Sequence, residues 1–432
     1  MPNSKKLSLL AAIFINLNVM IGTGIFINTY NLSASTGAAG FLLYPLVGLC
    51  MLPLITITGK LLGYFPTGGL YAFGSSYNPF LGFLSCWSYF FGKLASCAVM
   101  LSVGATMLQK LIPGAQNLNI TSLCLMILVL FTLLNLQNMK TGIIIQGFFL
   151  TAKSIPILLT ILAGIVYFDT STISAQQFIW HNMPMNIPLV LYCLAGFETA
   201  CALGRTIENA SVNGPKAVYY SFSIIMILYG IFQGCIYMNT HDLLATMSGY
   251  QGIFPVIAHK LFTNSMIAQK MSLVLNFAIG SSALGGAYGI LFANSWNLFT
   301  IAENNHIPGS SFIRQLSQYN TPWVAVLSES LICAMFLLCN QTSLLSLQST
   351  ASLGIVISYT ISAFAYYQLL KKNGANLKEF LIAGAAFFTC TLFVASCALN
   401  FFKTGIMPLL LFIAILVVGT ALFTYQNRPN KA

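Results

Sequence analysis

The sequence predicts an all-α polytopic membrane protein with about twelve transmembrane helices, and three observations lead to this prediction. Of the 432 residues, 57% are hydrophobic and only 6% are Asp, Glu, Lys or Arg, whereas soluble domains carry roughly a quarter charged residues. Apolar runs of about 20 residues, the length that crosses a bilayer core, recur along the chain. Most basic residues stand singly between these runs, as topology signals do.

The expected spans follow one another with short connections. No charged residue occurs between Lys6 and Lys60, and the region around Gly37 divides that stretch into two spans. The twelve expected spans cover residues 7–31, 40–62, 80–108, 120–138, 142–168, 187–204, 217–239, 270–301, 322–340, 343–370, 379–401 and 404–425. Even the longest connections, near 169–186 and 240–269, are too short for a separate soluble module, so the whole chain is expected to form one transmembrane domain.

The distribution of Lys and Arg predicts that both chain ends lie in the cytoplasm. With that orientation, twelve basic residues fall in inside segments and four in outside segments, as the positive-inside rule requires. The inside residues are Lys5, Lys6, Lys60, Lys140, Arg205, Lys216, Arg314, Lys371, Lys372, Lys378, Arg428 and Lys431, and the outside residues are Lys110, Lys260, Lys270 and Lys403. The compact loops and tails favour a bacterial inner membrane. The net charge of +11 is scattered rather than gathered into a patch, so we expect no nucleic-acid partner.

The cysteine and histidine residues indicate neither a metal nor a cofactor. Nearly all of the eleven Cys residues lie in apolar runs without a CxxC pair, which predicts buried thiols rather than disulfides or zinc ligands. All four His residues fall in expected connections. A membrane-embedded enzyme needs a paired nucleophile and base, or metal ligands, at membrane depth, and a channel needs rings of polar pore residues. The sequence has neither pattern, so we expect neither class of protein.

Two of the spans carry glycine motifs that predict broken helices. The first contains Gly22-Thr23-Gly24, and the sixth contains Gly196 two residues before Glu198. Unwound backbone at membrane depth is tolerated only where it faces protein or a cavity, and the N–H groups of a helix start attract a carboxylate. Breaks at positions one and six are typical of an inverted repeat of five plus five helices. The two expected repeats and a pair of accessory helices cover residues 7–168, 187–370 and 379–425. The alternative is that the glycines only allow close helix packing.

Five motifs in order give the sequence a resemblance to a known family. They are Ile21–Phe26 (IGTGIF), Phe65–Tyr71 with Pro79–Phe83, Ala195–Glu198, Glu208–Ala217, and Ala302–Pro308 with Thr321–Pro322. With this set the chain resembles the amino acid–polyamine–organocation transporter superfamily. The resemblance implies an amino acid permease, a secondary active transporter with alternating access to a site in the middle of the bilayer.

The resemblance also implies where a substrate would be held. The implied substrate-binding residues are Ile21, Gly22, Thr23, Gly24, Tyr192, Cys193, Ala195 and Gly196. Backbone amides of the first glycine motif would bind the substrate carboxylate. Backbone carbonyls of Ile21, Cys193 and Ala195 would face its ammonium group. Tyr192 stands where related exchangers carry an aromatic gate residue.

Lys153 is the first of four ionisable residues expected inside the bilayer, where such residues are costly and commonly functional. It lies twelve residues after Thr141, about 18 Å along a helix, which is near the middle of a core about 30 Å thick. The resemblance places Lys153 where sodium-coupled relatives bind Na⁺ and some proton-coupled members carry a lysine. Its expected role is proton coupling, in which the ammonium braces the first and eighth spans. The alternative is a permanently charged lysine bound to carbonyls.

Glu198 and Lys93 are the second and third ionisable residues expected inside the bilayer. Glu198 lies beside the second break, with proton coupling as its expected role and capping of the unwound segment as the alternative. Lys93 lies about 20 Å along a helix from Pro79, at a position where the family often has a polar amide or an aromatic residue. Lys93 therefore either lines the substrate pocket or forms an ion pair, with Glu198 as a partner.

Glu329 is the fourth ionisable residue in an expected span. It is expected to reach the inner interface because it lies only about 10 Å from Pro322 along the helix. It is left out of the site. The aromatic residues of the third and tenth spans, such as Trp87 and Tyr89, are interpreted as packing and interfacial side chains.

The leading hypothesis is proton-coupled symport of an amino acid, with protons and the amino acid as the small partners. Two alternatives share the same site. One is an amino-acid exchanger without net ion coupling. The other is a sodium symporter, for which Ser281 and Ser282 offer hydroxyl ligands although Lys153 would compete with the ion.

Overall fold

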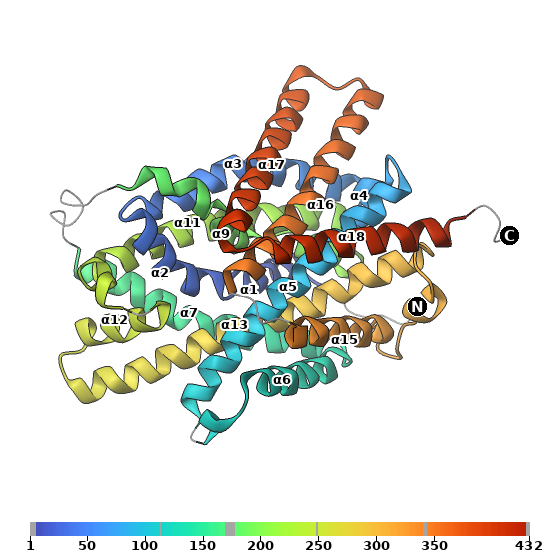
Figure 1. Ribbon diagram of the computed structural model, residues 1–432. Coiled ribbons are helices and arrows are strands. Elements are labelled where there is room, and N and C mark those ends of the chain that lie inside the picture. Colours follow the sequence, from blue (N-terminus) through green and yellow to red (C-terminus); the bar gives the residue numbers. More distant parts are fainter. Residues whose placement is uncertain (1–5, 113, 169–177, 248, 340–343, 429–432) are drawn as a thin grey trace.

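The computed structural model describes residues 6–112, 114–168, 178–247, 249–339 and 344–428. Helices make up nearly all of this part of the chain, and the only β-type pairings among the described residues are two isolated bridges, Leu7 with Ile207 and Gly37 with Phe178 (Figure 1). The prediction of an all-α polytopic membrane protein is therefore confirmed. Lys5 and Lys431, which entered the charge count, and the first half of the expected connection 169–186 lie outside the described residues.

Each expected span coincides with a helix or with an interrupted pair of helices. In chain order these are α1 (Leu9–Met20) with α2 (Gly24–Thr36), α3 (Gly40–Tyr64), α5 (Pro79–Leu111), α6 (Ile120–Asn135), α7 (Met139–Val166), α9 (Met183–Leu194) with α10 (Thr199–Ala202), α11 (Ala210–Thr240), α13 (Ser265–Glu303), α15 (Trp323–Cys339), α16 (Leu344–Asn373), α17 (Leu377–Thr404) and α18 (Met407–Gln426). Within the described ranges, eight single helices are long and apolar enough to cross a membrane, and the bent pair α1–α2 makes a ninth span. The remaining three ranges are shorter or interrupted, so the count of twelve stays a prediction.

Two short helices lie in segments where the sequence predicted connections. The helix α4 (Gly69–Ser75) follows Gly68, whose φ of 88° is left-handed. The helix α12 (Ile253–Leu261) lies within the connection expected at 240–269, and it buries Phe254 and Ile257. Nine residues are too few to cross a bilayer, which needs about 20. His259 lies on this helix, whereas the sequence analysis expected it in a loop.

The first break separates α1 from α2 at Ile21, Gly22 and Thr23, and it bends the span by 44°. Close packing explains why glycine stands there. A Cβ on Gly22 would lie 2.3 Å from the terminal methyl of Met100 on α5, and a Cβ on Gly286 of α13 would lie 3.2 Å from Cα of Gly22. The predicted break in the first span is confirmed.

The second break separates α9 from α10 over the four residues from Ala195 to Glu198. Gly196 has a φ of 127°, a conformation that L side chains rarely adopt. Asn16 on α1 donates a hydrogen bond of 2.9 Å to the carbonyl of Phe197, so this unwound backbone group has a partner. The predicted break in the sixth span is confirmed.

The helices α5 and α13 form the centre of the molecule and cross one another near the middle of Figure 1. Both are mostly buried, and α1, α7 and α16 pack around them. By contrast, only 17% of the most apolar part of α18 is buried, as expected for a helix that faces lipid along most of its surface. This arrangement brings the two breaks against the buried centre.

Candidate functional site

The two breaks meet at a small enclosed cavity. Six helices contribute to its walls: α1, α2, α5, α9, α13 and α16. The lining residues are Val19, Met20, Gly24, Lys93, Ser96, Met100, Tyr192, Cys193, Ala195, Ile290 and Ile355. In this closed conformation the cavity has room for about one water molecule. An amino acid therefore enters only when the surrounding helices move apart.

Backbone groups at the first break have distinct partners. The carbonyl of Ile21 accepts hydrogen bonds from Lys153 and from Ser282, and Ser282 also donates 3.1 Å to the carbonyl of Gly22. Thr23 is the N-cap of α2 without a side-chain cap bond. The first N–H groups of α2 consequently lack a capping side chain, which is the arrangement that receives an anion.

The end of α9 packs against the start of α2. The hydroxyl of Tyr192 lies 3.4 Å from the Thr23 hydroxyl and accepts a hydrogen bond of 3.2 Å from Ser96. A Cβ on Gly24 would lie 2.7 Å from Sγ of Cys193 and 3.0 Å from the Tyr192 ring. Glycine at position 24 therefore allows the two half-helices to meet at the cavity.

Lys153 lies beside this break and is fully buried. Its ammonium donates a hydrogen bond of 2.8 Å to the carbonyl of Asn18 and a second hydrogen bond to the carbonyl of Ile21. Lys153 takes part in none of the four ion pairs among the described residues. It thus links α7 to the C-terminal end of α1 through carbonyl groups alone.

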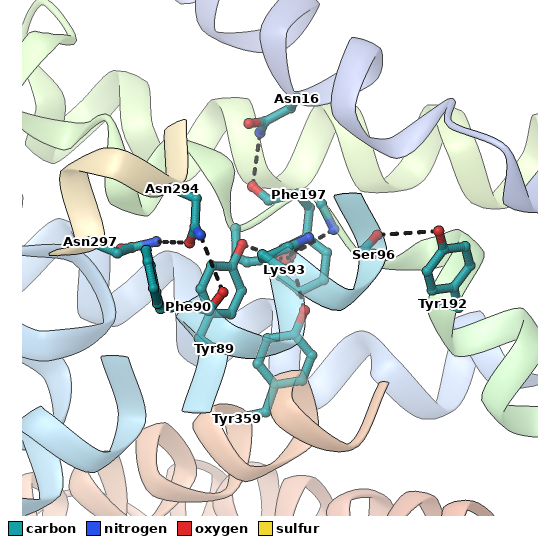
Figure 2. Close-up of polar contacts among 12 residues, drawn as sticks. Asn16, Tyr89, Phe90, Lys93, Ser96, Tyr192, Phe197, Asn294, Asn297 and Tyr359 are labelled. Carbon is teal, nitrogen blue, oxygen red and sulfur yellow. Dashed lines mark hydrogen bonds and ion pairs between the residues drawn. The ribbon is translucent and has the colours of Figure 1, made fainter. Parts of the chain in front are cut away.

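Lys93 and Glu198 form a buried ion pair, with Nζ 2.9 Å from Oε1. The Tyr89 hydroxyl donates a hydrogen bond of 2.9 Å to the same oxygen, and the Tyr359 hydroxyl donates one of 2.9 Å to Oε2 of Glu198. The Gly196 amide also donates to Oε2 at 2.8 Å. Figure 2 shows Lys93, Tyr89 and Tyr359 converging on this carboxylate from α5 and α16. Lys93 both lines the cavity and pairs with Glu198, so the two alternatives for Lys93 do not exclude one another.

A second small cavity is also lined by Lys93. It shares Val19, Lys93 and Ile290 with the first cavity, and its other lining residues are Tyr89, Thr199, Ala202, Ala293, Asn294 and Asn297. Lys93 therefore lines two neighbouring cavities while its ammonium is paired with Glu198.

The family model for amino acid permeases matches residues 7–425, nearly the whole chain. The chain belongs to the amino acid permease family. The family assignment makes it an integral membrane protein that transports amino acids, and it agrees with the expectation that the chain is no enzyme.

Three curated relatives illustrate the breadth of this permease family. The permease is 24% identical to isp5 of Schizosaccharomyces pombe, named as a putative amino-acid permease of the sexual differentiation process, over 91% of this chain and 72% of the relative. It is 22% identical to the amino-acid permease AapA of Bacillus subtilis, over 83% and 80%. It is 20% identical to the aromatic amino acid transport protein AroP of Salmonella typhimurium, over 81% and 76%.

Some polar residues of the permease site were not predicted. Tyr89 was interpreted as a packing residue, but it is buried and donates to Glu198. Tyr359 and Ser96 lie outside the motifs of the family resemblance, and an aromatic or a serine within an apolar span gives no distinct signal. Glu329 was expected to reach the inner interface. That expectation was wrong, because Glu329 is 1% exposed and its carboxylate binds Asn294.

A hydrogen-bonded pair of a tyrosine and a histidine lies outside the membrane-spanning helices of the permease. The hydroxyl of Tyr71 on α4 lies 2.7 Å from Nε2 of His306, which is 5% exposed in the segment after α13. Burial lowers the pKa of His306 below its usual value of 6.5 and raises the pKa of Tyr71 to about 12. Both groups are therefore uncharged near neutral pH. The hydrogen bond between them links α4 with the segment after α13.

Proposed function

We propose that the permease is a proton-coupled symporter that carries neutral amino acids as zwitterions, with Lys153 as the group that binds the coupled proton. The observation that carries this proposal is the fully buried Lys153 ammonium, bound only to the carbonyls of Asn18 and Ile21. A buried charge without an opposite charge is costly. Loss of a proton removes that charge, so Lys153 is suited to switch between two states.

The switch acts on the segment that would hold the substrate. When Lys153 is protonated, its ammonium holds the carbonyl of Ile21 and with it the start of the unwound turn at Gly22 to Gly24. The neutral amine binds a carbonyl less strongly because charge-assisted hydrogen bonds are the stronger ones. Deprotonation would then loosen α1 from α7 and let the amides that receive the carboxylate move.

The chemistry of the cavity favours an uncharged, apolar side chain. Met100, Ile290 and Ile355 give it apolar walls. Lys93 is already neutralised by Glu198, whereas a cationic side chain would disturb this pair. The carbonyls of Cys193 and Ala195 remain the favoured acceptors for the substrate ammonium, because the Ile21 carbonyl already accepts two hydrogen bonds.

Glu198, the ion-pair partner of Lys93, takes part in the same coupling mechanism as Lys153. Lys93 lines both cavities, so a movement of Lys93 that opens the pair would connect the substrate cavity with the second one. The charge distribution favours a cytoplasmic location for both chain ends, and a bacterial inner membrane is the proposed location.

Uptake into proteoliposomes tests the proposal. Radiolabelled L-leucine is supplied outside, with an imposed proton gradient, an imposed sodium gradient, or unlabelled L-leucine inside and no ion gradient. Competition by L-phenylalanine, L-serine, L-arginine and L-glutamate defines the substrate class. We expect proton-driven accumulation of L-leucine, with competition from neutral but not from charged amino acids.

The variant Lys153→Gln keeps polarity and removes the titratable charge, so it should lose accumulation driven by the proton gradient. Lys140→Gln is the matched control, because Lys140 is an exposed lysine at the start of the same helix. Accumulation driven only by sodium would favour the sodium symporter. Uptake that needs internal L-leucine and ignores both gradients would favour the exchanger. Full proton-driven accumulation by Lys153→Gln would refute the coupling role of Lys153.

A further inference from the structure

Glu329 has a different environment from every other acidic residue that the structure describes. The sequence has seven acidic residues, and Asp169 lies outside the described residues. Glu208 is exposed at the surface. Four acids pair with a basic residue, namely Glu379 with Lys60, Glu198 with Lys93, Glu303 with Arg205 and Asp242 with His241. Glu329 is 1% exposed and belongs to none of these pairs.

The two carboxyl oxygens of Glu329 differ in their surroundings. Oε1 accepts a hydrogen bond of 2.9 Å from the side-chain amide of Asn294 on α13, and that amide also donates 3.2 Å to the carbonyl of Phe90 on α5. Oε2 is buried and has no hydrogen-bond partner among the described residues. In the described part of the chain, the neutral amide of Asn294 is the only hydrogen-bond partner of this carboxyl group.

The helices around Glu329 supply no compensating charge. The titratable groups that face it are thiols: Cys97 on α5 and Cys333 on its own helix α15, with Cys124 on α6 beyond Cys333. Lys93 also lies on α5, but its ammonium is bound to Glu198. An ionised carboxylate needs a cation or several donors in a buried site, and a proton on Oε2 removes that need.

A path for the proton begins at the second cavity. Asn294 and Asn297 both line this cavity, and Asn297 donates 3.0 Å to the side-chain oxygen of Asn294 (Figure 2). The Asn294 side chain therefore connects the Glu329 carboxyl with a cavity that Lys93 also lines. Rotation of this amide, or a shift of α13 relative to α15, would expose the carboxyl to water in the cavity.

We propose that Glu329 is a second proton-binding site of the permease, loaded in the closed conformation and emptied into the second cavity when α13 and α15 separate. The step is a proton transfer only: the Oε2–H bond breaks, a water molecule in the cavity receives the proton, and the carboxylate remains. The role in transport rests on the proposed proton coupling, whereas the protonated state of Glu329 does not. Glu329 would add to Lys153 a site on the opposite side of α13.

Infrared spectroscopy of the purified full-length protein tests the protonated state directly and needs no substrate. A protonated carboxyl group has a C=O stretch that is separate from those of carboxylates and amides and that shifts in heavy water. We expect one such band near neutral pH in the unmodified protein, its loss in Glu329→Gln, and a displaced band in Glu329→Asp. The control Glu303→Gln removes an acid that is paired with Arg205, so it should leave the band unchanged.

A second readout connects the site with transport. The uptake of L-leucine is measured across a series of pH values for the unmodified protein, Glu329→Gln and Glu329→Leu. Glutamine imitates the protonated acid permanently and keeps an acceptor for Asn294, so its uptake should persist with a flattened pH profile. Leucine removes that acceptor and should lower uptake at every pH.

The outcomes separate this inference from the proposed function. Absence of the band in the unmodified protein, or its persistence in Glu329→Gln, overturns the protonated state of Glu329. A Glu329→Gln profile identical to that of the unmodified protein overturns its part in transport, even if Lys153→Gln has lost proton drive. Full proton drive in Lys153→Gln refutes the coupling role of Lys153 and leaves the infrared result unaffected.

Discussion

Lys93 and Glu198 are joined by a 2.9 Å contact that is closed to solvent, and Lys93 also lines two neighbouring cavities. Each partner comes from a different part of the molecule: Lys93 from the long central helix α5, and Glu198 from the unwound turn before α10. Backbone bonds of the turn here span three residues instead of four, such as that from the Thr199 amide to the Gly196 carbonyl at 3.0 Å. Its position therefore depends on side chains, and the Lys93–Glu198 pair is the charged part of that support.

Loss of Lys93 should destabilise the protein strongly. Lys93→Met leaves the Glu198 charge buried without its partner, and removal of one member of a buried pair typically costs about 3–5 kcal/mol. Thermal unfolding in detergent measures the effect. The double variant Lys93→Met/Glu198→Gln should recover most of the loss because no lone charge remains. Lys60→Met removes a partly exposed pair with Glu379 and should change the stability by about 0–1 kcal/mol. Equal losses in the two single variants would contradict this prediction.

Removal of the Tyr359 hydroxyl should weaken the same cluster in a graded way. Tyr359→Phe deletes one donor to Glu198, and a hydrogen bond to a charged group contributes about 1.5–3 kcal/mol. The midpoint of thermal unfolding should fall, but by less than in Lys93→Met. Tyr367→Phe on the same helix changes a residue that is 39% exposed and serves as the control. A Tyr359→Phe variant as stable as this control would show that the hydroxyl bond adds nothing.

A methyl group at position 24 should stop transport. Gly24→Ala places Cβ 2.7 Å from Sγ of Cys193, and excess volume in a packed site costs about 1–3 kcal/mol. L-Leucine uptake into proteoliposomes should be lost or much reduced. The double variant Gly24→Ala/Cys193→Ala removes the Sγ atom and should recover part of the uptake. Gly147→Ala, where a Cβ meets nothing within 4 Å, should transport normally. Normal uptake by Gly24→Ala would show that the two half-helices need not meet so closely.

How much of this arrangement the sequence predicts depends on the residue type. Glycine has few roles inside a membrane helix, so Gly22 and Gly196 indicated the two breaks correctly. Tyr89 escaped prediction because a tyrosine in an apolar span is equally compatible with packing, and only the fold brings its hydroxyl to Glu198. Glu329 was misplaced because distance along one helix gives depth in the bilayer and not the face of the helix. That face points to Asn294, about 35 residues earlier in the chain.

Acidification should weaken the contact between Tyr71 and His306. Because burial lowers the pKa of His306, the native state resists protonation, whereas an unfolded histidine binds a proton below about pH 6.5. As the pH falls through that value, the unfolded state takes up more protons, and the free energy of unfolding decreases. Thermal unfolding between pH 7.5 and pH 5 should therefore show a smaller loss of stability in His306→Gln than in the unmodified protein. His259→Gln, at an exposed histidine, should keep the original slope. Identical slopes in all three proteins would exclude His306 as the titrating group.

The isolated bridge between Leu7 and Ile207 has a practical consequence. The Leu7 amide donates 2.7 Å to the carbonyl of Thr206, and the Glu208 amide donates 2.9 Å to the carbonyl of Leu7. The N-terminal segment is thereby fastened to the stretch that leaves α10. A fluorescent protein or purification tag fused directly before Leu7 would crowd this attachment. A tag after the lipid-facing helix α18 would be the better choice for labelling and expression.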